Sequence, residues 1–392
     1  MRDLFYYNRY LVCLLNCFSI LLWVLLIVVD GCDLYLAPST LLGSGRGIIC
    51  GKDFPIDYIV ETVPSIIIEK KIVDQSQLAN YVYGRHDDHE KMIMFGAGAI
   101  YNSLPSEALK NVHHIWTEPG QAIYPHSMIS LVVYQILINE GKRGYELFTA
   151  YGKNWFAARG IYEDLSSYIH PQIKLSDSDL KRFGVCITDV YIADSKQPFG
   201  GVGLFARRSF KKGEVVTVTP VLSMSRSLVD SGHIETNDLI NYCIASKSSE
   251  MVLFPLNYPA VINHGFENTS NVRLDWFNWA GIPGINESYA YYLRNIVNND
   301  HSLQKTIHEL IYSPFAQLDL AYIATRDIAE NEEILLHYGR RWELAWEEYQ
   351  KLCGYSRMKK EIWKREMPDC SYVFREYIEA PDGMYPDHWY NL

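Results

Sequence analysis

An internal repeat constrains the fold of this chain more than any other feature of its sequence. DLYLAPSTLLGSGRGIICGKDF recurs without a gap as DVYIADSKQPFGGVGLFARRSF, and two further blocks recur later in the same order. The matching blocks are residues 33–54 and 189–210, 99–116 and 260–277 with a one-residue gap, and 144–155 and 331–342. Three blocks in one order predict a tandem duplication.

The repeated blocks have the pattern of β-strands. Val and Ile alternate with polar residues in short runs, such as YIVETVPSIII and EVVTVTPVLSM, and Gly and Pro punctuate them. Helical patterns appear in ELAWEEYQKL at 343–352 and in FAARGIYEDLSSYI at 156–169. The sequence therefore predicts a mainly β fold with some helix.

The second copy carries three motifs with chemical meaning. Gly201 and Gly203 flank a turn, where glycine lets the backbone adopt positive φ and approach a ligand closely. Asn263-His264 follows an apolar run and offers both hydrogen-bond donors and acceptors. Tyr338-Gly339 ends an apolar strand. Each motif alone is more often an ordinary turn, polar loop or packed aromatic. The functional prediction therefore depends on the order and spacing of the three motifs together.

This ordered set resembles the SET-domain methyltransferases. The resemblance implies two tandem SET-like domains with a β-clip and a pseudoknot, and S-adenosylmethionine as cofactor. It implies a lysine-bearing protein or peptide as substrate, with Tyr338 as the catalytic residue. The residues that it assigns to cofactor binding are Gly201, Gly203, Leu204, Asn263 and His264. Tyr242 is a further candidate, for which core packing is the simpler prediction.

The first copy keeps fewer of these residues. It retains Gly45-Arg46-Gly47 and Tyr151-Gly152, but Asn102-Ser103 stands where the second copy has Asn-His. We therefore expect a degenerate SET-like domain with a structural or binding role. The predicted organisation is a signal peptide or anchor at 1–31, the degenerate domain at 32–160, a linker at 161–188, the SET domain at 189–350 and an aromatic tail at 351–392.

Two departures from the family pattern stand out. Gly265 replaces the serine that usually follows Asn-His, and no Cys-rich tail follows the second copy. The eight Cys are scattered without zinc-ligand spacing, so no metal site is predicted. If the tail closes the active site, the candidate closing residues are Trp363, Tyr385 and Trp389.

The N-terminal residues have the pattern of a membrane-targeting segment. Residues 11–29 are almost purely apolar, and Arg2 and Arg9 precede them. A run of this length predicts a hydrophobic helix that acts as a signal peptide or a signal anchor. The charge asymmetry predicts a protein of the secretory pathway, or a membrane-anchored one, with its soluble part in the lumen.

The net charge of the chain limits the kinds of partner that it is expected to bind. A net charge of −10 disfavours direct nucleic-acid binding and permits a basic peptide substrate. Two function classes stay open: a protein-lysine methyltransferase acting through the second copy, and an inactive SET-fold pseudoenzyme serving as a protein-interaction module. A membrane-anchored structural protein with no ligand is a third hypothesis. The oligomeric state is not predicted.

Overall fold

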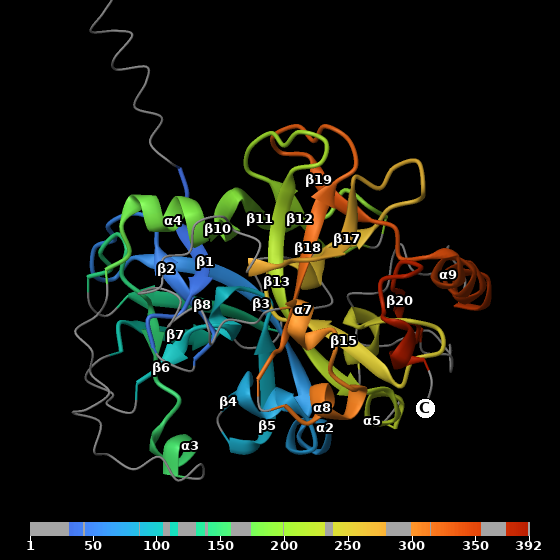
Figure 1. Cartoon of the computed structure of the whole chain (residues 1–392), viewed down its shortest axis with the longest axis horizontal. Coiled ribbons are helices and arrows are strands. Elements are labelled where there is room, and N and C mark those ends of the chain that lie inside the picture. Colours follow the sequence, from blue (N-terminus) through green and yellow to red (C-terminus); the bar gives the residue numbers. More distant parts are fainter. Residues whose placement is uncertain are drawn as a thin grey trace, which may run out of the picture.

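Strands dominate the computed structural model of the chain, which confirms the mainly β prediction (Figure 1). The structure describes residues 31–390 apart from 42–43, 86, 105–109, 117–130, 138–139, 158–173, 199, 232–237, 280–298, 314 and 354–373. The apolar segment 11–29 and Trp363 lie outside these residues, as does most of the helical pattern at 156–169. Within the described part of the chain, no helix has the length and apolarity needed to cross a bilayer.

The first half of the chain builds three small sheets. The largest has the order β4-β5-β3-β8-β7, the second has the order β10-β1-β2, and β6 pairs with β9 in parallel. The strands are β1 (Leu34–Pro38), β2 (Arg46–Cys50), β3 (Ile59–Glu69), β4 (Tyr83–Arg85), β5 (Asp87–Met94), β6 (Asn102–Ser103), β7 (Val112–Trp116), β8 (Leu131–Leu137), β9 (Phe148–Thr149) and β10 (Val185–Cys186).

The second half builds one large sheet. Its order is β11-β12-β19-β17-β18-β13-β15-β14-β20, and β16 pairs with β19 off this path. The strands are β11 (Val190–Asp194), β12 (Val202–Ala206), β13 (Val215–Ser225), β14 (Ile244–Ala245), β15 (Met251–Pro255), β16 (Asn263–His264), β17 (Val272–Trp276), β18 (Leu318–Ala324), β19 (Glu333–Leu336) and β20 (Ile378–Glu379). The run β17-β18-β13-β15-β14 has the same order of pairing as β7-β8-β3-β5-β4.

An irregularity recurs in the two longest strands. The pairing of β3 with β8 shifts register between Ile59 and Glu61, and the pairing of β13 with β18 shifts between Val215 and Thr217. These positions are equivalent when the repeat alignment is extended without a gap. Bulges of this kind kink a strand and increase its twist, so both long strands bend at the same place.

Short helices connect the strands. The α-helices are α2 (Lys70–Asp74), α3 (Lys153–Ala157), α4 (Asp177–Phe183), α5 (Arg226–Asp230), α7 (Asn299–Ser302), α8 (Ile307–Ile311) and α9 (Arg340–Cys353). The 3-10 helices are η1 (Gln77–Asn80), η2 (Ala97–Ala99), η4 (Ile187–Asp189), η5 (Asp238–Tyr242), η6 (Tyr258–Val261) and η8 (Asp387–Trp389). Helix α9 confirms the helical pattern at 343–352.

Helix α4 lies within the stretch that the sequence predicts to be a polar linker, 161–188. Ser176 accepts a hydrogen bond from the Asp179 N–H, and Asp179 accepts one from the Ser176 N–H, which forms a capping box. Leu180 is fully buried, and β10 pairs with β1. The described part of this linker is therefore packed against the first half.

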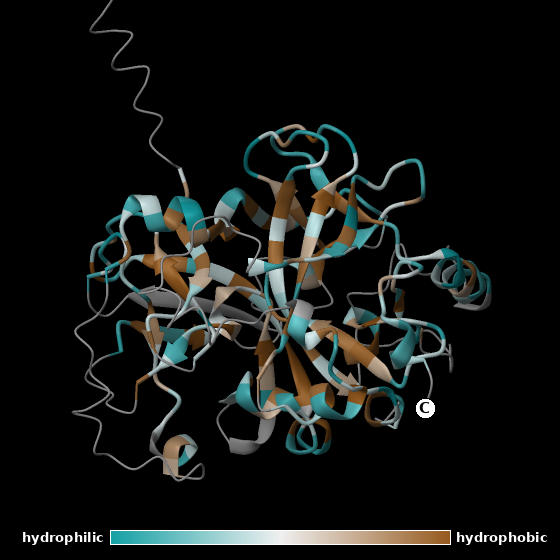
Figure 2. Cartoon of the chain, viewed as in Figure 1, coloured by the Kyte–Doolittle hydropathy of each residue, from teal (hydrophilic) through white to brown (hydrophobic). Residues whose placement is uncertain are grey.

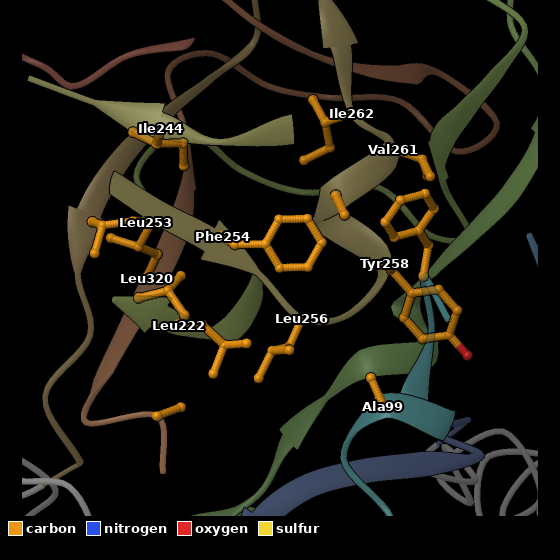
Figure 3. Close-up of a cluster of buried hydrophobic side chains, with 14 of the residues drawn as sticks. Ala99, Leu222, Ile244, Leu253, Phe254, Leu256, Tyr258, Val261, Ile262 and Leu320 are labelled. Atoms are coloured by element: carbon orange, nitrogen blue, oxygen red, sulfur yellow. The ribbon is translucent and has the colours of Figure 1, made fainter. Parts of the chain in front are cut away.

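The two halves share one large hydrophobic core, and a smaller buried cluster lies between β1, β2 and α4. Hydrophobic residues are concentrated in the inner strands, and hydrophilic residues are frequent in the loops and outer helices (Figure 2). Figure 3 shows Tyr258 and Phe254 of the second half in the same cluster as Ala99 of the first half. The Tyr258 hydroxyl donates to Oε2 of Glu61 at 2.7 Å.

A buried ion pair also joins the halves. Nε of Arg46 donates to Oδ2 of Asp319 at 2.8 Å, and Nε1 of Trp279 donates to the same oxygen at 2.7 Å. Both charged side chains are almost completely excluded from solvent. Because a buried charge is costly without its partner, this pair fixes how the halves pack.

Cys32 and Cys186 form a disulfide that joins the start of the first half to the linker that follows it. The scattered cysteines of the sequence did not predict this bond. The two cysteines are separated by 154 positions. Strand pairing of β1 with β10 brings them together, because Cys186 lies opposite Tyr35.

Candidate functional site

The turn between β11 and β12 explains both glycines of the first motif. Gly201 has φ +59, in the left-handed region that favours glycine. A Cβ at Gly203 would lie 2.4 Å from Oε1 of Glu333. Leu204 is fully buried in β12 opposite Ile334. The fold itself therefore requires these residues, whether or not a ligand lies against them.

Glu333 is the hub of the site; it belongs to the Glu332-Glu333-Ile334 part of the third motif, but it was not among the predicted catalytic or cofactor-binding residues. Its carboxylate accepts hydrogen bonds from Oγ of Ser195 at 2.6 Å and from the backbone N–H of Lys196 at 2.8 Å. Nδ2 of Asn263 donates to it at 3.2 Å and to the carbonyl of Val202 at 2.8 Å. Glu333 and Ser195 both lie in the repeated blocks, which is the signal that could have found them.

A crossing of strands brings the second and third motifs together. Strand β16 pairs in parallel with β19, so Asn263 lies opposite Leu335 and His264 opposite Leu336. Downstream, Asn271 accepts a hydrogen bond from the Leu335 N–H at 2.8 Å. The loop between turns tightly at Gly265, where a Cβ would lie 3.0 Å from the backbone nitrogen of Ser270. Close packing therefore accounts for the glycine that departs from the family pattern.

His264 ties the Asn-His motif to the Tyr-Gly motif. Its Nδ1 accepts a hydrogen bond from the backbone N–H of Tyr338 at 3.1 Å, so the neutral ring carries its proton on Nε2. Burial lowers the pKa of His264 to about 4. Nε2 lies 3.5 Å from Oε1 of Glu343 and has no hydrogen-bond partner among the described atoms. The ring also lies 4.8 Å from that of Trp342.

Contacts at both the hydroxyl and the ring hold the Tyr338 side chain in place. Its hydroxyl donates to the backbone carbonyl of Ile262, and its ring packs edge-on against Trp342 at 4.9 Å between centroids. Burial raises the pKa of this hydroxyl well above the ordinary value of tyrosine. The side chain is therefore neutral and fixed in orientation. Tyr242 lies with its ring 4.7 Å from Phe95 and packs on the core, as the simpler prediction had it.

The C-terminal segment lies directly against this motif. The N–H of Glu379 donates to the carbonyl of Tyr338 at 2.8 Å, and its Oε1 accepts from the N–H of Arg341 at 3.1 Å. The Glu379 carboxylate also fills the space beside Gly339. Tyr385 and Trp389, which were candidates to close the site, are instead buried in the core.

The first half contains the same set of contacts. Glu146 accepts from Oγ of Ser39 at 2.9 Å, from the Thr40 N–H at 2.6 Å and from Nδ2 of Asn102 at 2.8 Å. The Tyr151 hydroxyl donates to the carbonyl of Tyr101 at 2.7 Å. Oγ of Ser103 accepts from the Tyr151 N–H at 3.1 Å. Ser103 therefore replaces the bond that His264 makes, although the imidazole is missing.

Comparison with known proteins found one family match, which lies in the second half. Residues 201–339 match the model of the SET domain family. No curated protein matches the chain. Similar solved structures include a Plasmodium falciparum protein described as a histone methyltransferase, with 19% identity over 40% of this chain and 96% of that chain, at a TM-score of 0.25.

Two further similar structures are of the Chaetomium thermophilum polycomb repressive complex 2. One has 18% identity over 38% of this chain and 15% of its own chain, at a TM-score of 0.25. The other, in an autoinhibited conformation bound to S-adenosylmethionine, has 16% identity over 42% and 17%, at a TM-score of 0.26. These low scores add nothing to the family match. Residues 201–339 are therefore the part of this chain that is similar to the SET domain family.

Proposed function

We propose that the second half is an S-adenosylmethionine-dependent protein-lysine N-methyltransferase. The observation that carries this proposal is the tie between motifs, in which His264 accepts from the Tyr338 N–H while the Tyr338 hydroxyl donates to Ile262. Both contacts lie inside the region that matches the SET domain. These contacts place the Asn-His motif directly beside the Tyr-Gly motif.

The residues present fit the cofactor's amino-acid end. Nε2 of His264 is a buried N–H that makes no hydrogen bond among the described atoms, with Oε1 of Glu343 3.5 Å away, so it is a donor that could serve a polar group of the cofactor. Asn263 uses its amide hydrogens within the protein, so its carbonyl oxygen is the group left to accept from an ammonium. We assign cofactor contacts to the backbone of Gly201, Gly203 and Leu204 and to Asn263 and His264. S-adenosylmethionine, when bound, supplies a methyl group on a sulfonium.

Tyr338 is the residue that we assign to the reaction itself. A neutral, immobile hydroxyl can orient a lysine amine for in-line attack, and such alignment removes a large part of a barrier. The amine attacks only after losing its proton, which a desolvated channel favours by lowering its pKa. The role of Tyr338 is therefore positioning and polarity rather than base catalysis.

A pseudoenzyme is the second candidate, and one observation favours it. Both amide hydrogens of Asn263 and the hydroxyl hydrogen of Tyr338 are already bonded within the protein. The same bonds occur in the first half, where the histidine is absent. They could therefore serve the fold alone, in a protein that binds peptides without modifying them.

Tandem duplication is a further part of the proposal. The shared order of strands, the matching bulges and the matching Glu146 and Glu333 hubs support it. We place a degenerate SET-like domain at 32–160, a linker at 161–188, the active domain at 189–350 and a tail at 351–392. The signal peptide or anchor at 1–31 precedes them.

We also propose a lumenal location for the folded part. Disulfides persist in oxidising compartments, and the Cys32–Cys186 bond supports this placement. Asn268 begins an Asn-Thr-Ser sequon and is exposed in its loop, where glycosylation could occur. Protease protection of membrane vesicles that carry the protein, with and without detergent, tests the orientation. Digestion of the folded part without detergent would contradict it.

Calorimetric titration with S-adenosylmethionine tests the enzyme proposal. The full chain is the right sample, because a fragment of the second half would expose the core that it shares with the first. Saturable binding, lost in His264→Ala but kept in Lys71→Ala, is the expected result. A folded protein that binds no cofactor would leave the interaction module as the better description.

A further inference from the structure

A hollow of about 690 Å³ lies beside the Tyr-Gly motif of the first half. Its walls come from α2, from β4 and the residue before it, and from the start of α3. The lining residues that matter here are Lys70, Asp74, Val82, Gly84, Tyr151 and Gly152. Strand β4 is at the end of its sheet, and no described strand pairs with its outer edge. An edge of this kind is a template for another strand.

In the second half, the corresponding space is filled by the chain's own C-terminal segment. The Ile378 N–H donates to the Cys243 carbonyl and the Ala380 N–H to the Ala245 carbonyl, both at 2.9 Å. Strand β20 thereby extends β14 in parallel. This pairing shows what kind of ligand such an edge takes in this fold.

The registers of the sheets make β4 the equivalent of β14. Tyr83 pairs with Met92, and Ile244 pairs with Leu253. Met92 and Leu253 in turn pair with equivalent positions of the two longest strands, Ile67 and Ser223. Val82 and Gly84 therefore stand where Cys243 and Ala245 receive the C-terminal segment.

The side-chain contacts of that segment also have equivalents in the hollow. The Tyr377 hydroxyl donates to Oδ1 of Asp230 at 2.6 Å, and Arg226 lies over the Tyr377 ring at 4.8 Å. At the aligned positions, α2 carries Lys70 and Asp74 with the same four-residue spacing. Lys70 and Asp74 form an exposed ion pair with each other, so a bound tyrosine would lie against this pair.

Glu379, the acidic residue two positions after Tyr377, also occupies a place that has an equivalent in the first half. The Glu379 carboxylate fills the space beside Gly339. Gly152, at the aligned position, also has positive φ, +85, and no described atom lies within 4 Å of where its Cβ would be. Lys91 lines the hollow where the second half has Val252, which adds a positive charge to the wall.

We propose that this hollow binds an extended acidic peptide segment of a partner protein. The segment adds in parallel to β4, with a tyrosine against Lys70 and Asp74 and an acidic residue two positions later beside Gly152. Main-chain bonds to the edge give affinity, and the two side-chain sites give specificity. The proposal rests on the correspondence between the halves and not on methyltransferase activity.

Fluorescence anisotropy on the full chain tests this proposal. The probe is a labelled peptide with the sequence of residues 374–385, FREYIEAPDGMY. We expect saturable binding, and Lys70→Ala/Asp74→Ala should weaken it about tenfold or more, because a charge-assisted hydrogen bond is lost. Lys71→Ala, an exposed change on the same helix, should leave affinity unchanged. A peptide lacking the tyrosine and the following glutamate should bind correspondingly weakly.

Three results would overturn the proposal. The first is absence of saturable binding by a folded chain. The second is loss of binding in Arg226→Ala/Asp230→Ala but not in the α2 variant, which would mean that the peptide displaces the C-terminal segment. The third is a photo-crosslinking residue at Asn154 that captures the same chain or a second copy in place of the peptide. None of these depends on cofactor binding, so the enzyme proposal is tested separately.

Discussion

Nδ2 of Asn263 lies 3.2 Å from Oε1 of Glu333, and the same pair of atoms in Asn102 and Glu146 lies 2.8 Å apart. In each half, this bond holds the strand of the second motif beside the strand of the third. The glycine of the first motif is equally close, because a Cβ at Gly203 would collide with the Glu333 carboxylate. One buried glutamate therefore organises all three motifs.

Replacing Glu333 should destabilise the protein strongly. Glu333→Ala leaves the Ser195 hydroxyl, the Lys196 N–H and the Asn263 amide with fewer partners, at a cost of about 2–4 kcal/mol in the free energy of unfolding. Urea denaturation followed by circular dichroism measures this. Glu330→Ala, an exposed neighbour, is the control and should change stability by less than about 0.5 kcal/mol. Equal effects of the two changes would contradict the claim that Glu333 holds the three motifs together.

Tyr338→Phe should separate chemistry from cofactor binding. Loss of the hydroxyl should lower kcat about 100-fold or more, while the Kd for S-adenosylmethionine stays within about twofold, because we assign this group to the chemical step. Turnover assays on a lysine peptide and calorimetry give the two values. Tyr151→Phe removes the equivalent hydroxyl of the first half and should leave kcat unchanged. An equal loss of turnover and affinity in Tyr338→Phe would refute the assigned role.

His264 should make stability depend on pH in the acid range. Its pKa is about 4 in the folded chain against an ordinary value of 6.5, so between these values the unfolded chain binds more protons. Stability contributed by the neutral ring is present above pH 6.5 and is lost as pH falls toward 4, by on the order of 2 kcal/mol. Denaturation midpoints across this range should fall less steeply for His264→Gln. Parallel curves for the two proteins would show that another group is responsible.

The Cys32–Cys186 bond should contribute measurably to stability. It closes a loop with a sequence separation of 154, and removing such a constraint costs about 3–5 kcal/mol in the chain-entropy model. Cys32→Ser/Cys186→Ser should therefore unfold at lower urea concentration than the unchanged protein. Dithiothreitol should lower the midpoint of the unchanged protein and leave that of the double variant where it is. Peptide mapping without reduction should recover the two cysteines linked, and their recovery as free thiols would contradict the bond.

The repeat made much of the site predictable. Ser39, Glu146, Ser195 and Glu333 all lie in blocks that match by inspection, so the hub could have been identified from the sequence. The third motif contains Glu333, but a pattern of residue types does not reveal that its carboxylate accepts hydrogen bonds from Ser195, Lys196 and Asn263. The first copy lacks the histidine, and only the structure shows that Ser103 preserves its bond to the backbone.

The sequence by itself determined the strand-rich class of the fold, the order of the motifs and the helix after the second copy, because local periodicity and self-similarity express these directly. Only the tertiary structure decided that Arg46 pairs with Asp319, that Cys32 meets Cys186, and that β20 lies against Tyr338. These contacts join residues far apart in the chain, and no short pattern encodes them. They depend on how distant segments pack together, which is settled by burial and by the cost of leaving a buried charge or a sheet edge without a partner.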